Sequence, residues 1–242
     1  MVLLDVRPLK LSFVKGGLFL GKKKLKPSVR TLRELQDVVQ DIRFLVEADQ
    51  DMRCYFMYRD LYPPLAEKGL RYDITILPPI RLGKEFNKTM GHYHPEAREG
   101  LSYCELYEVL QGRAHYLLQK REGGKIADVL LVRARKGDAV PIPPNYGHIT
   151  INPGKTPLVM ANLVARDFES IYQDYLNMRG GAYYELADGS FRQNPMYGKL
   201  PELKVIDAAK RWGRQNILAR CLSHPEEFAF LLDPSKYPPM RD

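Results

Sequence analysis

The chain has 242 residues, of which 45% are hydrophobic and 27% charged, a composition typical of a soluble globular protein with one substantial core. Its formal net charge of +8 is compatible with an anionic substrate, but the basic residues are spread out, so we expect no nucleic-acid partner. No apolar run is long enough to cross a bilayer and the N-terminus lacks the layout of a signal peptide, so we expect no membrane partner either.

The cysteines indicate the compartment. Cys54, Cys104 and Cys221 are unevenly placed and form no CxxC motif. This pattern argues against a disulfide framework and for reducing surroundings. We therefore expect a cytoplasmic protein.

The N-terminal segment, residues 1–60, is predicted to form an arm and one helix. The arm should contain a short strand over Leu9–Phe13, followed by a glycine turn. Thr31 and Glu34 have the spacing of a capping box, which marks the start of a helix. Apolar residues follow at helical spacing: Leu32, Leu35, Val38, Val39 and Ile42. The pattern predicts an amphipathic helix of about three turns that covers a sheet face.

Short strands crowd together after Tyr72, each bounded by Gly, Pro, Asn or charged turns. The predicted strands are Asp73–Leu77, Phe86–His94, Tyr103–Leu110, Ala114–Gln119, Asp128–Ala134, Ala139–Ile142, Gly147–Asn152 and Leu158–Val164. Many short strands without intervening helices indicate an antiparallel sandwich or barrel. We therefore expect a mainly β fold with its barrel core at about residues 72–190, within a single domain that spans residues 1–242.

The chain after these strands is predicted to be partly helical. Glu169–Met178 has a helical pattern, and Ala182–Leu186 should add one more strand. A C-terminal extension over residues 195–242 contains two expected helices, Ile206–Trp212 and Pro225–Leu232. Their apolar residues need burial, so we expect them to pack on the barrel.

Three histidines and one glutamate stand in a pattern suited to a metal ion. In an extended strand His92 and His94 project from the same face, and His148 begins another strand after a double proline. Glu105 opens the strand before Gly112 and shares its face with Tyr107, whereas Glu108 should lie on the opposite, solvated face. Three neutral imidazoles and one carboxylate suit a divalent first-row ion, and the sequence leaves Fe, Mn, Ni, Co and Zn open.

These residues resemble the two motifs of the cupin superfamily. His92-x-His94, Glu105 and a glycine seven positions later match the first motif. The second motif is matched from Gly137 to Asn152, except that Asn145 stands in place of a glycine. The resemblance implies a cupin double-stranded β-helix, a jelly-roll barrel that encloses a pocket, with helices flanking it at both ends of the chain.

Within that superfamily, the chain resembles the cupin-type phosphoglucose isomerases of archaea over about Tyr55 to Tyr175. The shared patterns are Thr-x-Gly-His-x-His ending at His94, Glu105 with Tyr107, and Pro-Pro-x-x-x-His-x-Thr-x-Asn ending at Asn152. One departure is that ten residues separate His94 from Glu105, more than the family usually has. We expect a longer hairpin loop there. Glu96 and Glu99 are alternative ligands, but only Glu105 keeps the family's interval to the following glycine.

The resemblance implies a metal-dependent isomerase of glycolysis and gluconeogenesis that interconverts glucose 6-phosphate and fructose 6-phosphate. It favours iron as the ion and a homodimer as the assembly. Glu105 and Tyr107 would be catalytic. The residues expected to bind the sugar phosphate are Tyr55, Thr75, Thr89, Gly91 and Tyr172. The family holds the phosphate with hydroxyls and a backbone N–H rather than with an arginine clamp. Val164 and Ser170 stand where the family has a tyrosine and a histidine.

Other functions and two reaction routes stay open. The alternatives are a phosphomannose isomerase, a cupin iron dioxygenase and a non-catalytic sugar-phosphate-binding cupin. An isomerase can transfer a proton through a cis-enediol, with Glu105 as the candidate base, or use a metal-assisted hydride shift. The sequence does not decide between these routes.

Overall fold

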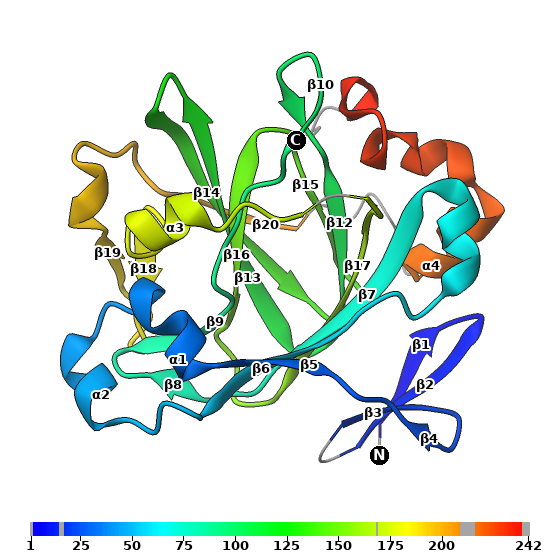
Figure 1. Ribbon diagram of the computed structural model, residues 1–242, viewed down its shortest axis with the longest axis horizontal. Coiled ribbons are helices and arrows are strands. Elements are labelled where there is room, and N and C mark those ends of the chain that lie inside the picture. Colours follow the sequence, from blue (N-terminus) through cyan, green and yellow to red (C-terminus); the bar gives the residue numbers. More distant parts are fainter. Residues whose placement is uncertain (1, 15–16, 168, 209–215, 239–242) are drawn as a thin grey trace.

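Two six-stranded sheets form the centre of the protein in the computed structural model, which describes residues 2–14, 17–167, 169–208 and 216–238 (Figure 1). The first sheet has the order β15 (Ala139–Ile142), β12 (Glu105–Gln111), β17 (Leu158–Ala165), β7 (Leu70–Leu77), β6 (Arg53–Tyr58) and β5 (Ser28–Thr31). The second has the order β20 (Lys204–Asp207), β14 (Lys125–Arg135), β13 (Arg113–Glu122), β16 (Tyr146–Asn152), β9 (Glu85–Lys88) and β8 (Arg81–Leu82). The predicted mainly β fold of two sheets is confirmed.

Smaller elements surround these sheets. An N-terminal sheet contains β1 (Val2–Val6), β2 (Leu9–Val14), β3 (Gly17–Leu20) and β4 (Lys23–Lys24). Two hairpins pair β10 (Glu96–Arg98) with β11 (Leu101–Ser102) and β18 (Tyr183–Glu185) with β19 (Phe191–Gln193). The α-helices are α1 (Leu32–Leu35), α2 (Ile42–Glu47), α3 (Gln173–Asn177) and α4 (Ile217–Ser223). The 3₁₀ helices are η1 (Gln36–Val38), η2 (Pro63–Lys68), η3 (Pro195–Tyr197), η5 (Pro225–Leu231) and η6 (Pro234–Lys236).

The first sheet is buried on both faces because two separate cores cover it. All eight residues of β17 are buried, and they alternate between the two cores. Leu158 and Met160 face the inner core, whereas Val159 and Ala161 face an outer core. That outer core includes residues of the N-terminal sheet and of the C-terminal helices, which cover this side of the sheet. The continuous apolar run in the sequence therefore reflects a strand without a solvent face.

The predicted three-turn helix after Thr31 is wrong in its length. The capping box is present, with the Thr31 N–H donating to Glu34 Oε2 over 2.9 Å, but the helix stops at η1 and α2 is separate. Val39 is extended, with φ −93° and ψ 129°. The next N–H, of Gln40, donates to Glu85 Oε1 over 2.7 Å instead of to a helical carbonyl. Ile42 is consequently 57% exposed, which the apolar stripe did not predict.

Elements at the two ends of the chain also differ from the prediction. β5 and β6 belong to the first sheet and β20 belongs to the second, although all three lie outside residues 72–190, the expected barrel core. Ile206 lies in β20, parallel to β14, so the helix expected from this residue is wrong at its start, and residues 209–212 lie outside the described ranges. The expected helix Pro225–Leu232 is present as the 3₁₀ helix η5. The helix expected at Glu169–Met178 is shortened to α3, and α4 was not predicted. The extent of the single domain remains a prediction.

Among the residues that the structure describes, no helix has both the length and the apolar character required to cross a membrane.

Glu108 lies beneath the elements that cover the outer side of the first sheet. The prediction that this side chain is solvated is therefore wrong. Its side chain points to the outer face of β12 and is 6% exposed, and Oε2 accepts a hydrogen bond from the Ile217 N–H over 2.9 Å. Burial raises the pKa of this carboxyl to about 8. The folded protein therefore keeps Glu108 protonated at pH values where the unfolded chain ionises it.

This pKa predicts a pH dependence of stability. Between pH 4.5, the ordinary pKa, and about pH 8 the folded state binds the extra proton, so the free energy of unfolding falls as the pH rises. Glu108 contributes a slope of about 1.4 kcal/mol per pH unit in that window. Glu108→Gln keeps the acceptor for Ile217 and should remove this slope, as measured by denaturant unfolding at several pH values. Glu47→Gln, on the exposed surface of α2, is the control. An unchanged slope in Glu108→Gln would show that the buried carboxyl is not responsible.

Candidate metal centre

Four side chains from different parts of the chain converge in the interior between the two sheets. His92 and His94 follow β9, Glu105 is the first residue of β12, and His148 lies in β16. Each offers one ligand atom, and these atoms all lie within 4.8 Å of one another. Nε2 of His94 and Nε2 of His148 lie 3.3 Å and 3.2 Å from Oε2 of Glu105. The structure thus brings together all four of the residues expected as ligands, in a group suited to a divalent metal ion.

Backbone hydrogen bonds fix the histidines. His92 and His148 exchange N–H to carbonyl bonds of 3.2 Å and 3.0 Å, which places their ring centroids 4.4 Å apart. This pairing is an isolated bridge beyond β9, so the predicted strand Phe86–His94 is shorter than expected. Nδ1 of His94 lies 2.9 Å from the Tyr103 carbonyl oxygen. Because a carbonyl only accepts, this contact places the hydrogen on Nδ1 and makes Nε2 the ligand atom of the ring.

The charges in the group match those that a metal ion needs. Burial, together with the neighbouring imidazoles, holds the pKa of His92 well below its usual range. Burial also lowers the pKa of His148, although Glu105 partly opposes this. Burial disfavours ionisation of Glu105, but its close contacts with the His148 and His94 rings outweigh burial and hold the pKa of this carboxyl well below its usual range. Neutral imidazoles and an ionised carboxylate are the forms that bind divalent cations, so the donor set fits such an ion.

A cavity opens over this group. It is lined by every residue that the sequence analysis expected to contact the sugar phosphate or to act in catalysis: Tyr55, Thr75, Thr89, Gly91, Tyr172, Glu105 and Tyr107. Val164 and Ser170, the two departures from the family pattern, also line it. The structure therefore gathers the whole predicted set around one pocket.

Contacts within the pocket hold several of these residues in place. Tyr107 Oη lies 3.1 Å from Nε2 of His148, and Thr89 Oγ1 accepts the Thr150 N–H over 2.9 Å. Gly91 has φ +85°, and a Cβ there would lie 2.6 Å from Cγ1 of Ile149 and 2.7 Å from the Tyr175 ring. Only glycine fits this position, so the backbone can face the cavity directly.

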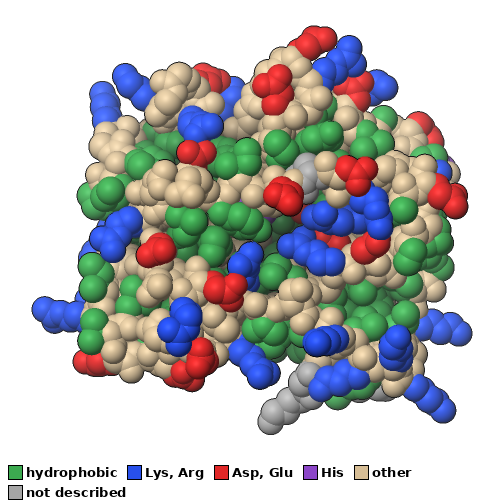
Figure 2. Space-filling view, viewed as in Figure 1, with side chains coloured by type: hydrophobic (Ala, Val, Ile, Leu, Met, Phe, Trp, Pro, Cys, Tyr) green, Lys and Arg blue, Asp and Glu red, His purple; other side chains and the backbone are tan. Residues whose placement is uncertain are grey.

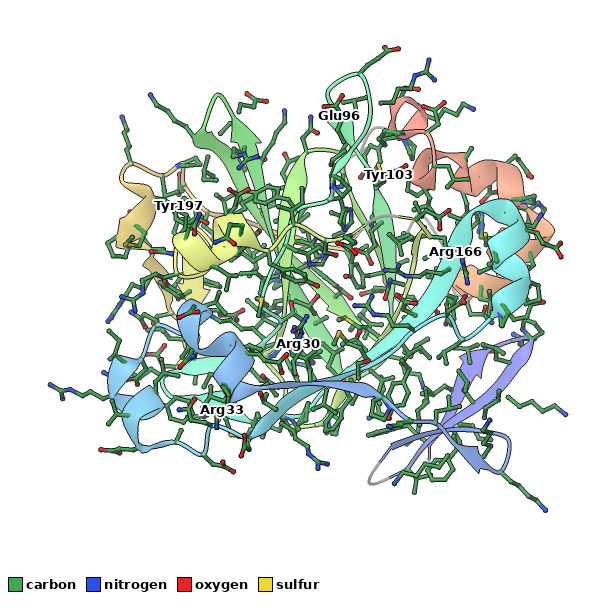
Figure 3. The ribbon with its side chains drawn as sticks, viewed as in Figure 1. Arg30, Arg33, Glu96, Tyr103, Arg166 and Tyr197 are labelled. Atoms are coloured by element: carbon green, nitrogen blue, oxygen red, sulfur yellow. The ribbon has the colours of Figure 1, made fainter. Side chains whose placement is uncertain are left out.

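The long interval before Glu105 forms the hairpin β10–β11, which lies outside the pocket. Figure 3 shows Glu96 on this hairpin, and its Oε1 accepts the Gly100 N–H over 2.8 Å. The side chain of Glu99 is 81% exposed. Asn145 ties the hairpin to β16, since Oδ1 accepts the Ser102 N–H and Nδ2 donates to the Gly100 carbonyl over 2.9 Å and 3.0 Å. Neither alternative glutamate belongs to the group of four.

Two arginines in the pocket wall, Arg59 and Arg71, were missed by the sequence analysis. Arg71 is four positions before Thr75 in β7. Strand alternation alone could therefore have placed Arg71 on the same face as Thr75. Asn162, in β17, also lines the cavity and was missed. Figure 2 shows basic and acidic side chains gathered beside a hollow near the centre of one face of the molecule.

Comparisons with known proteins identify a family and related chains. The family model described as glucose-6-phosphate isomerase (GPI) matches residues 29–202. The glucose-6-phosphate isomerase of Pyrococcus furiosus is 32% identical over 154 residues, covering 62% of this chain and 75% of the relative. The enzyme of the same name from Thermococcus onnurineus is 28% identical over 190 residues, covering 72% and 90%.

Among solved structures the similarities are distant. The cupin domain of an XRE-family transcriptional regulator from Enterobacter cloacae aligns with a TM-score of 0.31 and 15% identity, covering 46% of this chain and 94% of that domain. Oxalate decarboxylase from Bacillus subtilis aligns with a TM-score of 0.37 and 16% identity, covering 51% and 28%.

Proposed function

The chain belongs to the glucose-6-phosphate isomerase family, whose model spans residues 29–202, and we propose on this basis that it interconverts glucose 6-phosphate and fructose 6-phosphate. The observation that supports this most is the buried group His92, His94, Glu105 and His148 beneath a cavity lined by hydroxyls. An aldose and a ketose differ by a hydrogen moved between C1 and C2. A cation held beside C1 and C2 would polarise the neighbouring hydroxyl and carbonyl oxygens of the substrate.

We propose that the four ligands hold a divalent ion, which supplies Lewis-acid polarisation of the two substrate oxygens when bound. Glu105, ionised in this group, takes the proton from C2 and returns it to C1, while the hydroxyl hydrogen on O2 passes to O1 through the cis-enediol. Tyr107, 3.1 Å from His148, is positioned to donate a hydrogen bond to a substrate oxygen. Thr75, Thr89, the Gly91 N–H, Tyr55 and Tyr172 line the cavity and orient the sugar phosphate. Transfer of C2 deuterium to C1 without solvent exchange would favour the hydride route instead.

A coupled assay tests the function. Purified protein loaded in turn with Fe, Mn, Co, Ni and Zn should turn over glucose 6-phosphate and, in the reverse direction, fructose 6-phosphate. Mannose 6-phosphate and oxygen consumption are measured in parallel, because they identify a phosphomannose isomerase or a dioxygenase. Absence of turnover with every ion would contradict the proposal, and binding without turnover would indicate a non-catalytic sugar-phosphate-binding protein.

We propose iron as the native ion on the resemblance to the cupin-type isomerases, and metal analysis of the purified protein tests this. We also propose a cytoplasmic homodimer. The three cysteines are free and buried, which supports the cytoplasmic location. A largely apolar groove lies where the N-terminal sheet meets β5 and β6, with Val2, Phe13 and Phe56 in its lining, and this groove supports the dimer. A monomeric mass by light scattering across a concentration series would contradict the dimer.

A further inference from the structure

The pocket has a positively charged end as well as a metal end. Arg59 directly follows β6, and Arg71 lies in β7; both line the same cavity as His92, His94 and Glu105. The sheet register places Arg71 beside Val164, and Val164 beside Glu105. Arg71 is therefore two strands away from Glu105, about 10 Å at the usual strand spacing.

One buried carboxylate holds both guanidinium groups. Asp73 Oδ2 accepts from Nη1 of Arg59 over 2.8 Å and from Nε of Arg71 over 2.9 Å. Its Oδ1 accepts the Asp60 N–H over 2.8 Å, and the Asp73 side chain is 2% exposed. Two fixed positive charges thus share one negative charge, which leaves an excess of one positive charge in the pocket wall.

The other charged side chains beside these arginines lie at the rim, where Asp167 and Glu169 are exposed to solvent. Arg166, the next arginine along the rim, is paired through both of its terminal nitrogens with Asp60. Figure 3 shows Arg166 beside β7. Burial would lower the pKa of Arg59, but attraction to Asp73 and, more weakly, to Tyr172 and Glu105 raises it. Arg59 therefore stays protonated and contributes a positive charge to the pocket.

Both guanidinium groups keep donors for a further partner. A guanidinium has five N–H donors. Arg71 uses Nε on Asp73 and Nη1 on the Arg166 carbonyl, and Arg59 uses Nη1 on Asp73 and Nη2 on the Met57 sulfur. Within the described parts of the chain, Nη2 of Arg71 and Nε of Arg59 make no hydrogen bond. The Arg59 side chain is 45% exposed and the Arg71 side chain 20%, so solvent reaches both.

We propose that Arg59 and Arg71 form an anion clamp for the phosphate of the sugar phosphate. Asp73 positions the two guanidinium groups of this clamp. This inference rests on the proposed isomerase function, because it assigns the two ends of one substrate. The planar guanidinium fork matches the geometry of phosphate oxygens and binds them in pairs. Val164, which lies between Arg71 and Glu105 in the sheet, and Ser170 contribute small side chains to the cavity wall. The sequence analysis expected hydroxyls to hold the phosphate without arginines. In this proposal the hydroxyls and the two arginines bind it together.

Paired substitutions test the clamp on the full, metal-loaded protein. Arg59→Gln and Arg71→Gln remove the charge but keep a hydrogen-bonding side chain of similar length. Each should raise the KM for glucose 6-phosphate and the inhibition constant for inorganic phosphate by about tenfold to a hundredfold, the effect of losing one charge-assisted bond. The kcat and the metal content should stay within a few-fold. Arg33→Gln, which removes an arginine from the surface of α1, is the matched control and should change neither constant.

Arg59→Lys and Arg71→Lys keep the charge without the fork, and thermal unfolding shows that each variant is folded. They should give constants between those of the wild type and the glutamine variants. Unchanged KM and phosphate inhibition in folded glutamine variants would overturn the clamp and leave the isomerase function intact. If the wild type shows no isomerase activity, the proposed function fails. Stabilisation by inorganic phosphate then decides alone: loss of the shift in Arg71→Gln supports the clamp, and an equal shift in both proteins overturns it.

Discussion

Glu105→Gln is expected to lower kcat by about two or more orders of magnitude, within the range for loss of a general base. The carboxylate is 4% exposed and its Oε2 lies 3.2 Å and 3.3 Å from two imidazoles, so it is the negative charge at the centre of the group. A carboxamide has a similar size but attracts a dication less and cannot accept the C2 proton. Steady-state kinetics and metal analysis of the same preparation separate the two effects.

Glu96→Gln and Glu99→Gln are the controls for this variant. Both positions lie in the hairpin β10–β11 outside the group of four, so activity should stay within a few-fold of the wild type. If Glu99→Gln abolished metal binding while Glu105→Gln did not, the glutamate ligand would have been assigned to the wrong side of the hairpin. The metal-bound centre would then differ from the arrangement of the four residues described above.

Removing the metal should abolish turnover and lower the stability of the fold. The group has one carboxylate among three buried or half-buried imidazoles, and a cation that binds only the folded state stabilises it by mass action. At a free-metal concentration of 100 times the Kd this amounts to about 2.7 kcal/mol. Chelation should therefore lower the Tm and stop the assay, and adding back the divalent ion should restore both.

Histidine substitutions provide the control for chelation. The double variant His92→Gln, His94→Gln lacks two of the four ligands and should show no shift of Tm with chelator. His224→Gln, whose side chain is 56% exposed and lies outside the group, should behave as the wild type does. An equal shift in the double variant would indicate that the chelator removes a metal from elsewhere in the protein.

The sequence alone predicted the features that depend on local pattern. Closely spaced short segments bounded by turn residues predicted most strands of the two sheets, but not β5, β6, β8 and β20. Motif spacing predicted the ligand group, and it placed Glu105 rather than Glu99 beside the histidines despite the long interval. These features could be read locally because each is set by residues a few positions apart, or by a turn at a fixed distance such as the one at Gly112.

Only the tertiary structure decided the features that depend on partners distant in the chain. The helix after Thr31 breaks because Glu85, on another strand, accepts the Gln40 N–H. Glu108 is buried because α4 covers the outer face of β12. Arg59 and Arg71 share Asp73 because β6 pairs with β7, a contact that composition and local spacing do not encode. Burial and charge pairing are set by which surfaces meet, and those surfaces come together only when the chain folds.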